Sequence, residues 1–212
     1  MMIQMRWYLP GLVIGLIVGF YWARVIKLVL KARKSSGRAA NFVPPELLGR
    51  VLRIIWYPTV AAWIVVPLLT CFLHRRPPGL RLLFDQPIIA WFAVGIAFLA
   101  LWGTMICWRK MGKSWRMGID PNEKTALIIT GAYAYVRHPI YALSSLLMIA
   151  SVIAVPSIIM IIVGAIHLIC LQWEARREEQ YLIRLHGADY GLYLTKVGRF
   201  MPRSFARYVP GA

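Results

Sequence analysis

Long stretches without a charged side chain are the feature that most constrains how this chain folds. Three runs contain no Asp, Glu, Lys, Arg or His: Trp7–Ala23, Ile54–Leu73 and Pro87–Trp108. Each is close to the roughly 20 apolar residues that an α-helix needs to cross a hydrocarbon core about 30 Å thick. In a chain of 212 residues that is 59% hydrophobic, these runs predict an all-α integral membrane protein and exclude a soluble domain. The first run is longer than a usual signal-peptide core and its basic cluster follows it, so a retained helix is expected.

A fourth apolar stretch is too long for one membrane helix. It runs from Pro139 to Trp173, 35 residues interrupted only by His167. As a single helix it would be about 52 Å long at 1.5 Å per residue. Pro156, near its middle, lacks a backbone donor and breaks a helix. The sequence therefore predicts a helical hairpin, with residues 139–155 entering and 156–173 returning, and five transmembrane helices in all.

The predicted organisation has an N-terminal part, a core and a short tail. Residues 1–100 hold transmembrane helices over 1–30 and 51–73 and the start of a third over 86–108. Residues 101–203 form the core, with the hairpin 139–173 and a cytoplasmic C-terminal helical region, and residues 204–212 form the tail. Gly187 is expected to end the helix that leaves the membrane, and a second short helix is expected over 189–197.

Lys and Arg set the expected orientation, because cytoplasmic loops carry an excess of both. Eight lie between Arg24 and Arg53, six lie in 109–137 and seven follow Trp173. Five helices and an outside N-terminus place 21 of the 25 on the cytoplasmic side of a cell membrane. The net charge of +17 is therefore assigned to anionic lipid headgroups and to orientation, not to nucleic acid.

Small and sulfur-containing residues in the apolar runs are expected to serve packing. The stripe Gly11, Gly15 and Gly19 lets another helix approach closely. Packing within the chain is favoured over the alternative, a homodimer contact, and the oligomeric state stays open. The cysteines show no paired spacing, so neither a disulfide framework nor a metal site is predicted; they are Cys71, Cys107 and Cys170.

Arg137-His138-Pro139 stands where the hairpin is predicted to begin. Proline is favoured at the first position of a helix, and a helix N-terminus presents free N–H groups and partial positive charge to an anion. Arg137 and His138 would strengthen such an anion site. The alternative is that Arg137 anchors the chain to lipid headgroups and His138 is only its neighbour.

Three of the eight acidic residues lie where the chain leaves the membrane: Glu174, Glu178 and Glu179. For Glu174, charge pairing with the neighbouring arginines is favoured. Glu178 and Glu179 point about 100° apart on a helix, so at most one faces a pocket between the two ends of the hairpin. A carboxylate there would attract a cationic ligand. Arg199 would hold a substrate anion or a phospholipid phosphate.

These motifs, in this order, resemble one superfamily of membrane enzymes. "GAYAYVRHPIY", followed after the hairpin by "REEQYLIRLHGADYGLYLTKVGRFMP", is similar to the isoprenylcysteine carboxyl methyltransferases and phospholipid methyltransferases. The resemblance covers roughly residues 101–203, including "GKSWR". It implies an integral membrane enzyme, isoprenylcysteine carboxyl methyltransferase-like, that uses S-adenosylmethionine to methylate a hydrophobic or lipid-like acceptor.

The resemblance also implies roles for single residues. It assigns Arg199 and Glu178 to catalysis, and it assigns Trp115, Arg116 and Arg199 to the substrate. Residues 131–133 are Gly-Ala-Tyr where phospholipid N-methyltransferases have Gly-x-Gly, which weakens the transfer of phospholipid specificity. The implied cofactor-binding residues are Gly131, Tyr135, Arg137, His138, Tyr141, Glu178 and Glu179.

The chemistry of these side chains agrees with that cofactor. The carboxylate of S-adenosylmethionine suits the helix end at His138, and its ammonium group suits a glutamate. Its sulfonium suits the face of an aromatic ring, at about 0.5–2 kcal/mol per contact, and the candidates are Tyr135, Tyr141, Trp115 and Trp173. Methyl transfer is an in-line displacement that depends on positioning more than on strong acids or bases.

Two other functions remain open from the sequence. One is an NADPH-dependent membrane reductase of the steroid-reductase-like type, which would need more phosphate-binding groups than this C-terminal region offers. The other is a non-enzymatic membrane protein with the same fold, in which the charged motifs anchor the chain at the interface. The acceptor atom, whether of a carboxylate, an amine or a thiol, is also open.

Overall fold

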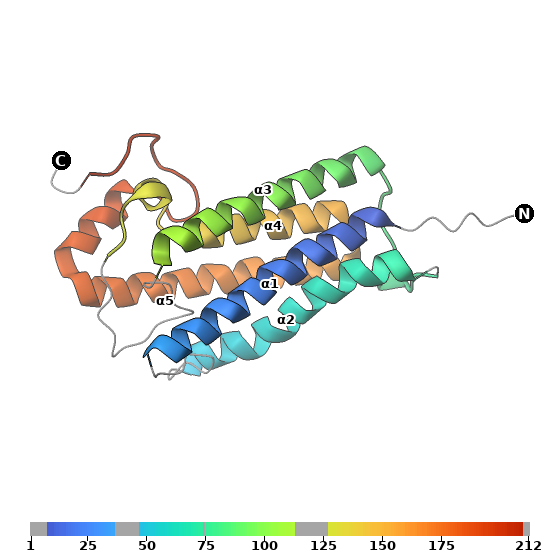
Figure 1. The fold of residues 1–212 in the computed structure, drawn as a ribbon, viewed down its shortest axis with the longest axis horizontal. Coiled ribbons are helices and arrows are strands. Elements are labelled where there is room, and N and C mark those ends of the chain that lie inside the picture. Colours follow the sequence, from blue (N-terminus) through green and yellow to red (C-terminus); the bar gives the residue numbers. More distant parts are fainter. Residues whose placement is uncertain (1–7, 37–46, 74, 113–126, 210–212) are drawn as a thin grey trace, which may run out of the picture.

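The described part of the chain is all-α. The computed structural model describes residues 8–36, 47–73, 75–112 and 127–209, and no strand lies among them. Trp115 and Arg116, and the connection after the first helix, fall outside these residues. The elements are α1 (Leu9–Ser36), α2 (Leu47–Phe72), η1 (Pro78–Leu80), α3 (Pro87–Met111), η3 (Gly131–Ala134), α4 (Pro139–Ala154) and α5 (Ile158–Lys196), where η marks a 3₁₀ helix (Figure 1).

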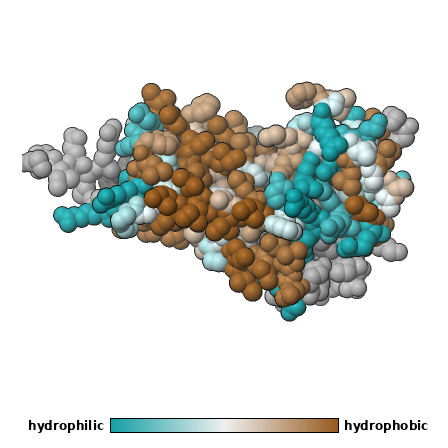
Figure 2. All heavy atoms as spheres, turned by 180° about the vertical axis from the view of Figure 1, so that it is seen from behind, coloured by the Kyte–Doolittle hydropathy of each residue, from teal (hydrophilic) through white to brown (hydrophobic). Residues whose placement is uncertain are grey.

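Four of the helices are long and apolar enough to cross a membrane: α1 over Leu9–Ala32, α2, α3 and α5. Hydrophobic side chains form a broad band on the face shown in Figure 2, between hydrophilic groups at the two ends. The fifth helix, α4, has 16 residues and is about 24 Å long, which is less than the hydrocarbon core. The prediction of a multi-pass, all-α membrane protein is confirmed.

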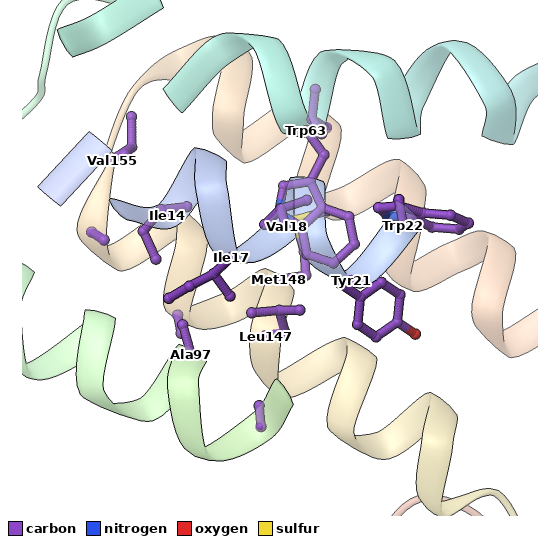
Figure 3. Close-up of a cluster of buried hydrophobic side chains, with 14 of the residues drawn as sticks. Ile14, Ile17, Val18, Tyr21, Trp22, Trp63, Ala97, Leu147, Met148 and Val155 are labelled. Atoms are coloured by element: carbon purple, nitrogen blue, oxygen red, sulfur yellow. The ribbon is translucent and has the colours of Figure 1, made fainter. Parts of the chain in front are cut away.

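The helices pack around a core that α1 crosses. Ile14 and Val18 of α1, Trp63 of α2 and Leu147 and Met148 of α4 are wholly buried (Figure 3). Helix α3 packs along α4, and α5 packs against both α2 and α4. Lipid tails are as apolar as these side chains, so moving them from lipid into the core brings no hydrophobic gain. Close packing between the helices therefore stabilises the bundle.

The glycines of α1 serve contacts within the chain. A Cβ added to Gly11 would lie 2.6 Å from the Pro67 carbonyl oxygen of α2, and one added to Gly15 would lie 2.6 Å from Cγ of Leu68. One added to Gly19 would meet nothing within 4 Å. The packing prediction is confirmed for Gly11 and Gly15, so both are already covered by α2 and are not available for a homodimer contact.

A buried polar network lies in the apolar core around His167. This histidine is the only Asp, Glu, Lys, Arg or His residue in the apolar stretch Pro139–Trp173. Trp56 Nε1 of α2 donates to His167 Nδ1 at 3.0 Å, and Ser144 Oγ of α4 lies 3.1 Å from His167 Nε2. The ring of Trp63 packs on the same imidazole, with centroids 4.6 Å apart. These contacts satisfy a polar ring that is otherwise costly in an apolar interior and tie α2, α4 and α5 together.

The predicted hairpin is present, and its second helix continues out of the apolar stretch to Gly187, where the helix that leaves the membrane was expected to end. Helix α4 ends at Ala154, and α5 begins at Ile158 after Ser157, whose side chain accepts from Met160 N at 3.3 Å. Neither proline nor glycine lies between Gly164 and Gly187, so nothing ends the helix at Trp173. At Gly187 (φ 57°, ψ −128°) it bends sharply, and its last part turns back toward η3 (Figure 1).

Candidate active site

Two segments far apart in the sequence form the floor of the candidate site. Pro139 opens α4, and the residues before it run parallel to those after α5, with a β-bridge between Val136 and Gly198. Arg137 N donates to Gly198 O at 2.8 Å, and His138 N donates to Arg199 O at 3.0 Å. These backbone bonds fix the two motifs side by side at the same end of the bundle.

A small tyrosine cluster holds the C-terminal part of α5 in place. Tyr190 and Tyr193 are almost wholly buried and pack with Val197. The Tyr193 hydroxyl donates to the Tyr133 carbonyl of η3 at 2.5 Å. Because Gly187 allows the helix to turn back, this contact joins the end of α5 to the segment that precedes Arg137.

Glu179 is the centre of an ion-pair cluster. Arg137 Nε donates to its Oε1 at 3.0 Å, and His138 Nε2 lies 3.3 Å from the same oxygen. Arg199 Nε donates to Oε1 at 3.0 Å and Arg199 Nη2 to Oε2 at 2.6 Å. Three cationic side chains therefore surround one carboxylate whose side chain is only 7% exposed.

Glu178 has fewer partners and is more open. The Tyr141 hydroxyl donates to its Oε1, and its Oε2 lies 3.4 Å from His138 Nδ1. The Glu178 side chain is 23% exposed. The ring of Tyr141 stacks on His138 at a centroid distance of 5.4 Å, while Phe200 meets the imidazole edge-on at 6.2 Å. A partly exposed carboxylate thus lies beside a group of aromatic rings.

The charged groups of the cluster shift one another's pKa values. Burial alone would lower the pKa of His138, but hydrogen bonds and attraction to Glu178 and Glu179 together raise that pKa above 6.5. Burial alone would raise the pKa of Glu179, but hydrogen bonds from His138 and Arg199 and the nearby positive charges hold it well below its usual range. Glu179 is therefore ionised at any pH near neutrality. His138 stays protonated to a higher pH than a histidine with the ordinary pKa of 6.5.

Arg137 is held from two sides. Besides Glu179, its guanidinium donates through Nη1 to the carbonyl oxygens of Leu194, at 3.1 Å, and of Val197. The Arg137 side chain is 5% exposed. A guanidinium with these partners is not at the lipid surface, so the interpretation of Arg137 as a headgroup anchor is wrong. Its contacts join the start of α4 to the end of α5.

A second charged cluster lies one turn earlier on α5. Glu174 Oε2 accepts from Arg177 Nη1 at 2.5 Å, as expected from the preference for local pairing. Its other oxygen, Oε1, lies 3.5 Å from Arg53 Nη2 of α2. From the sequence, Arg53 was expected only to contribute to orientation. In the structure it lies three residues before the buried Trp56, on the same face of α2.

The structure brings most of the expected site residues together. Arg137, His138, Tyr141 and Arg199 all contact Glu178 or Glu179. Gly131 (φ 66°) and Tyr135 lie just before the cluster, in η3 and directly after it, and take no part in these contacts. Gln172, which accepts from Arg199 Nη1 at 3.3 Å, and Phe200 were not expected.

The arrangement suits a small zwitterionic ligand with an apolar or cationic centre. Glu178 offers a carboxylate, the positive charges around Glu179 offer attraction for an anion, and the rings of His138, Tyr141 and Phe200 offer flat apolar faces. The three cysteines are free and buried. Among the residues described, no group of His, Cys, Asp or Glu has the arrangement of a metal site.

Comparison with known proteins gives the family. Residues 88–189 match the family model of phospholipid methyltransferase, a segment that includes α3, the hairpin and both glutamates of the cluster. No curated protein matches the chain. The matched residues 88–189, just under half of the chain, place this segment in the phospholipid methyltransferase family, whose members are membrane enzymes that use S-adenosylmethionine to methylate a lipid acceptor.

Proposed function

We propose that S-adenosylmethionine binds where η3 and α4 meet Glu178, with Glu178 receiving its ammonium group. One observation carries this assignment: Glu179 is already surrounded by Arg137, His138 and Arg199, whereas Glu178 is 23% exposed. A carboxylate saturated by three cations has little affinity for a further ammonium group, and a more open one retains it. Glu179 is then a positioning residue.

The cationic side of the same cluster supports the cofactor carboxylate. His138 is the residue before α4, where backbone N–H groups and the helix dipole favour an anion. The raised pKa of His138 adds positive charge there. The stacked rings of His138 and Tyr141 provide flat surfaces for the sulfonium side of the cofactor. Gly131 and Tyr135 would line the approach from η3.

When bound, S-adenosylmethionine supplies an electrophilic methyl group, and the chain contributes position and charge. Arg199 is the basic residue of the cluster best placed to meet a second ligand, because its side chain is 29% exposed. Its guanidinium is held by Glu179 and Gln172. We assign Arg199 to orienting an anionic or polar part of the acceptor at the reacting centre, where alignment controls the rate of transfer. Trp115 and Arg116 stay expectations for the substrate side.

We further propose that this site lies at the cytoplasmic face, with the N-terminus outside. The ends of α1 and α3, the start of α4 and the bent end of α5 lie toward one end of the bundle (Figure 1), and the basic segments flank that end. Helix α4 would then be a fifth, short span that sits close to the interface. The catalytic core would comprise residues 101–203, with α1 and α2 packed on it.

Methyl transfer to lipid tests the proposed function. Full-length protein in detergent is incubated with radiolabelled S-adenosylmethionine and a membrane lipid extract, and the organic phase is counted. The proposal predicts label in a lipid product for the wild type and a loss of at least tenfold for Glu178→Gln, with folding unchanged. Label in lipid at an equal rate with Glu178→Gln would overturn the site, and no label with the wild type would overturn the activity.

A further inference from the structure

Arg53 is buried with hydrogen-bonding capacity left over. Its residue is 3% exposed, and neither Nε nor Nη1 has a hydrogen-bond acceptor among the described residues. Buried polar atoms in proteins are nearly always paired, so such an exception requires an explanation. An arginine is a particularly costly exception, because it stays charged at any pH a protein meets.

The neighbours of Arg53 account for only part of that charge. Its Cζ lies 5.2 Å from the centroid of the Trp56 ring. Glu174 lies 3.5 Å from Arg53 Nη2, but it also accepts a 2.5 Å hydrogen bond from Arg177. Glu174 is therefore shared between two arginines, and it offers no hydrogen-bond acceptor to Nε or Nη1 of Arg53.

The position of Arg53 fits the depth of a lipid headgroup. It lies six residues into α2, about 9 Å from the start of the helix, at the end of the bundle that carries the candidate site. Glu174 and Glu178 are four residues apart and share one face of α5, about 6 Å along its axis. Arg53 is therefore next to the methyl-transfer site and on its membrane side.

The outer face of α2 at this level is open to lipid. Ile54, the residue after Arg53, is 72% exposed, and Tyr57, four residues after Arg53, is 39% exposed. Arg53 itself points inward, toward α5. A lipid lying along α2 has its chains against the exposed residues and its headgroup at the level of the buried guanidinium.

We propose that Arg53 binds the phosphate of a phospholipid acceptor and so holds the headgroup under the methyl-transfer site. A phosphodiester carries one negative charge, and its oxygens can accept from both Nε and Nη1 of Arg53. Charge-assisted bonds of guanidinium to phosphate are among the strong ones in proteins. This inference rests on the proposed function, which supplies the methyl donor beside it.

Binding of two labelled lipids tests the proposal. Fluorescent phosphatidylglycerol and diacylglycerol with the same chains are titrated into full-length protein in detergent. The wild type is expected to bind phosphatidylglycerol more tightly. Arg53→Gln is expected to lose about ten- to hundredfold of that affinity, the usual size for a hydrogen-bonded charge, while its affinity for S-adenosylmethionine stays within twofold. Arg50→Gln removes an exposed arginine one turn earlier and should change neither.

Glu174→Gln gives a second test that does not depend on the folding of the Arg53 variant. Removing the competing carboxylate raises the net positive charge at Arg53, so affinity for phosphatidylglycerol should increase severalfold. Equal binding of the two lipids by the wild type, or unchanged phosphatidylglycerol affinity in both variants, would overturn the proposal. Either result with intact S-adenosylmethionine binding leaves the proposed function standing, whereas its failure appears as a wild type that does not bind S-adenosylmethionine.

Discussion

Arg137 and Glu179, 42 positions apart in the sequence, form a buried ion pair in which Arg137 Nε donates to Glu179 Oε1 at 3.0 Å. The pair joins the segment before α4 to the middle of α5. Arg199 adds a third segment by donating to the same carboxylate. The motifs on the two sides of the hairpin are therefore parts of one electrostatic cluster, and Glu179 holds it together.

The two adjacent glutamates should respond differently to neutralisation. Glu179→Gln leaves the buried Arg137 and His138 and the partly exposed Arg199 with a neutral amide, so we expect a loss of about 3 kcal/mol in the free energy of unfolding. Glu178→Gln removes a partly exposed charge and should cost less than about 1 kcal/mol, while weakening S-adenosylmethionine binding at least tenfold. Chemical unfolding and calorimetry on the same preparations measure both. Equal destabilisation by the two variants would contradict the division of roles.

Stability should depend on pH through the same cluster. The folded-state pKa of His138 is raised above 6.5, so its contribution is complete below pH 6.5 and is lost as pH rises through the folded-state value. The pKa of Glu179 is held well below 4.5, so its contribution is present above pH 4.5 and is lost only as pH falls through its lower folded-state value. We expect the highest Tm between about pH 5 and 6.5, with a decline toward pH 9.

Thermal unfolding of the detergent-solubilised protein across this range checks the prediction. His138→Gln should flatten the decline above pH 6.5. His186→Gln, on the outer part of α5, is the matched control and should keep the wild-type decline. A decline of equal size in His138→Gln would show that another group carries it.

Substitutions of Arg199 and His138 should affect different quantities, the rate of methyl transfer and the affinity for S-adenosylmethionine respectively. Arg199→Ala removes the more exposed member of the cluster, so the rate of methyl transfer should fall at least tenfold with little change in S-adenosylmethionine affinity. His138→Ala should lower that affinity first, because it removes both positive charge and an aromatic face. Rates at saturating cofactor and calorimetric affinities distinguish the two. An unaltered rate in Arg199→Ala would make Arg199 a structural residue only.

The glycine stripe of α1 offers a prediction about packing. Gly11→Ala places a Cβ 2.6 Å from the Pro67 carbonyl and 2.7 Å from Thr70 Oγ1, so α1 and α2 must separate, at about 1–3 kcal/mol. Gly19→Ala meets nothing within 4 Å and should be neutral or slightly stabilising, because alanine favours a helix. Unfolding measurements compare the two. Equal effects would mean that α1 and α2 do not pack as described.

The helices could be predicted because their signals are local. Charge-free runs of about 20 residues mark α1 to α3, and Pro156 and Gly187 mark the turn of the hairpin and the bend of α5. The continuation of α5 beyond Trp173 to Gly187 could be predicted as well, because the apolar run ends at Trp173 but no residue there ends the helix. Hydropathy reports the boundary of the membrane, and only backbone breakers report the boundary of a helix.

The sequence predicts which residues form the site but not which of them contact one another. Spacing brought His138, Tyr141 and the two glutamates to one end of the hairpin. It did not indicate that Arg137 turns inward to Glu179, because a basic residue at a membrane boundary is equally typical of an anchor. Arg53 was missed for the same reason. Inward orientation depends on packing between α2 and α5, which no short motif encodes.

Cofactor binding is the most direct test of the central claim, that the cluster around Glu178 and Glu179 is the cofactor site of a methyltransferase. Isothermal titration calorimetry is run on the full-length protein in detergent, with S-adenosylmethionine and NADPH in separate titrations. We expect saturable heat with S-adenosylmethionine, an affinity at least tenfold lower in Glu178→Gln, and no binding heat with NADPH. Binding of NADPH without S-adenosylmethionine would contradict it.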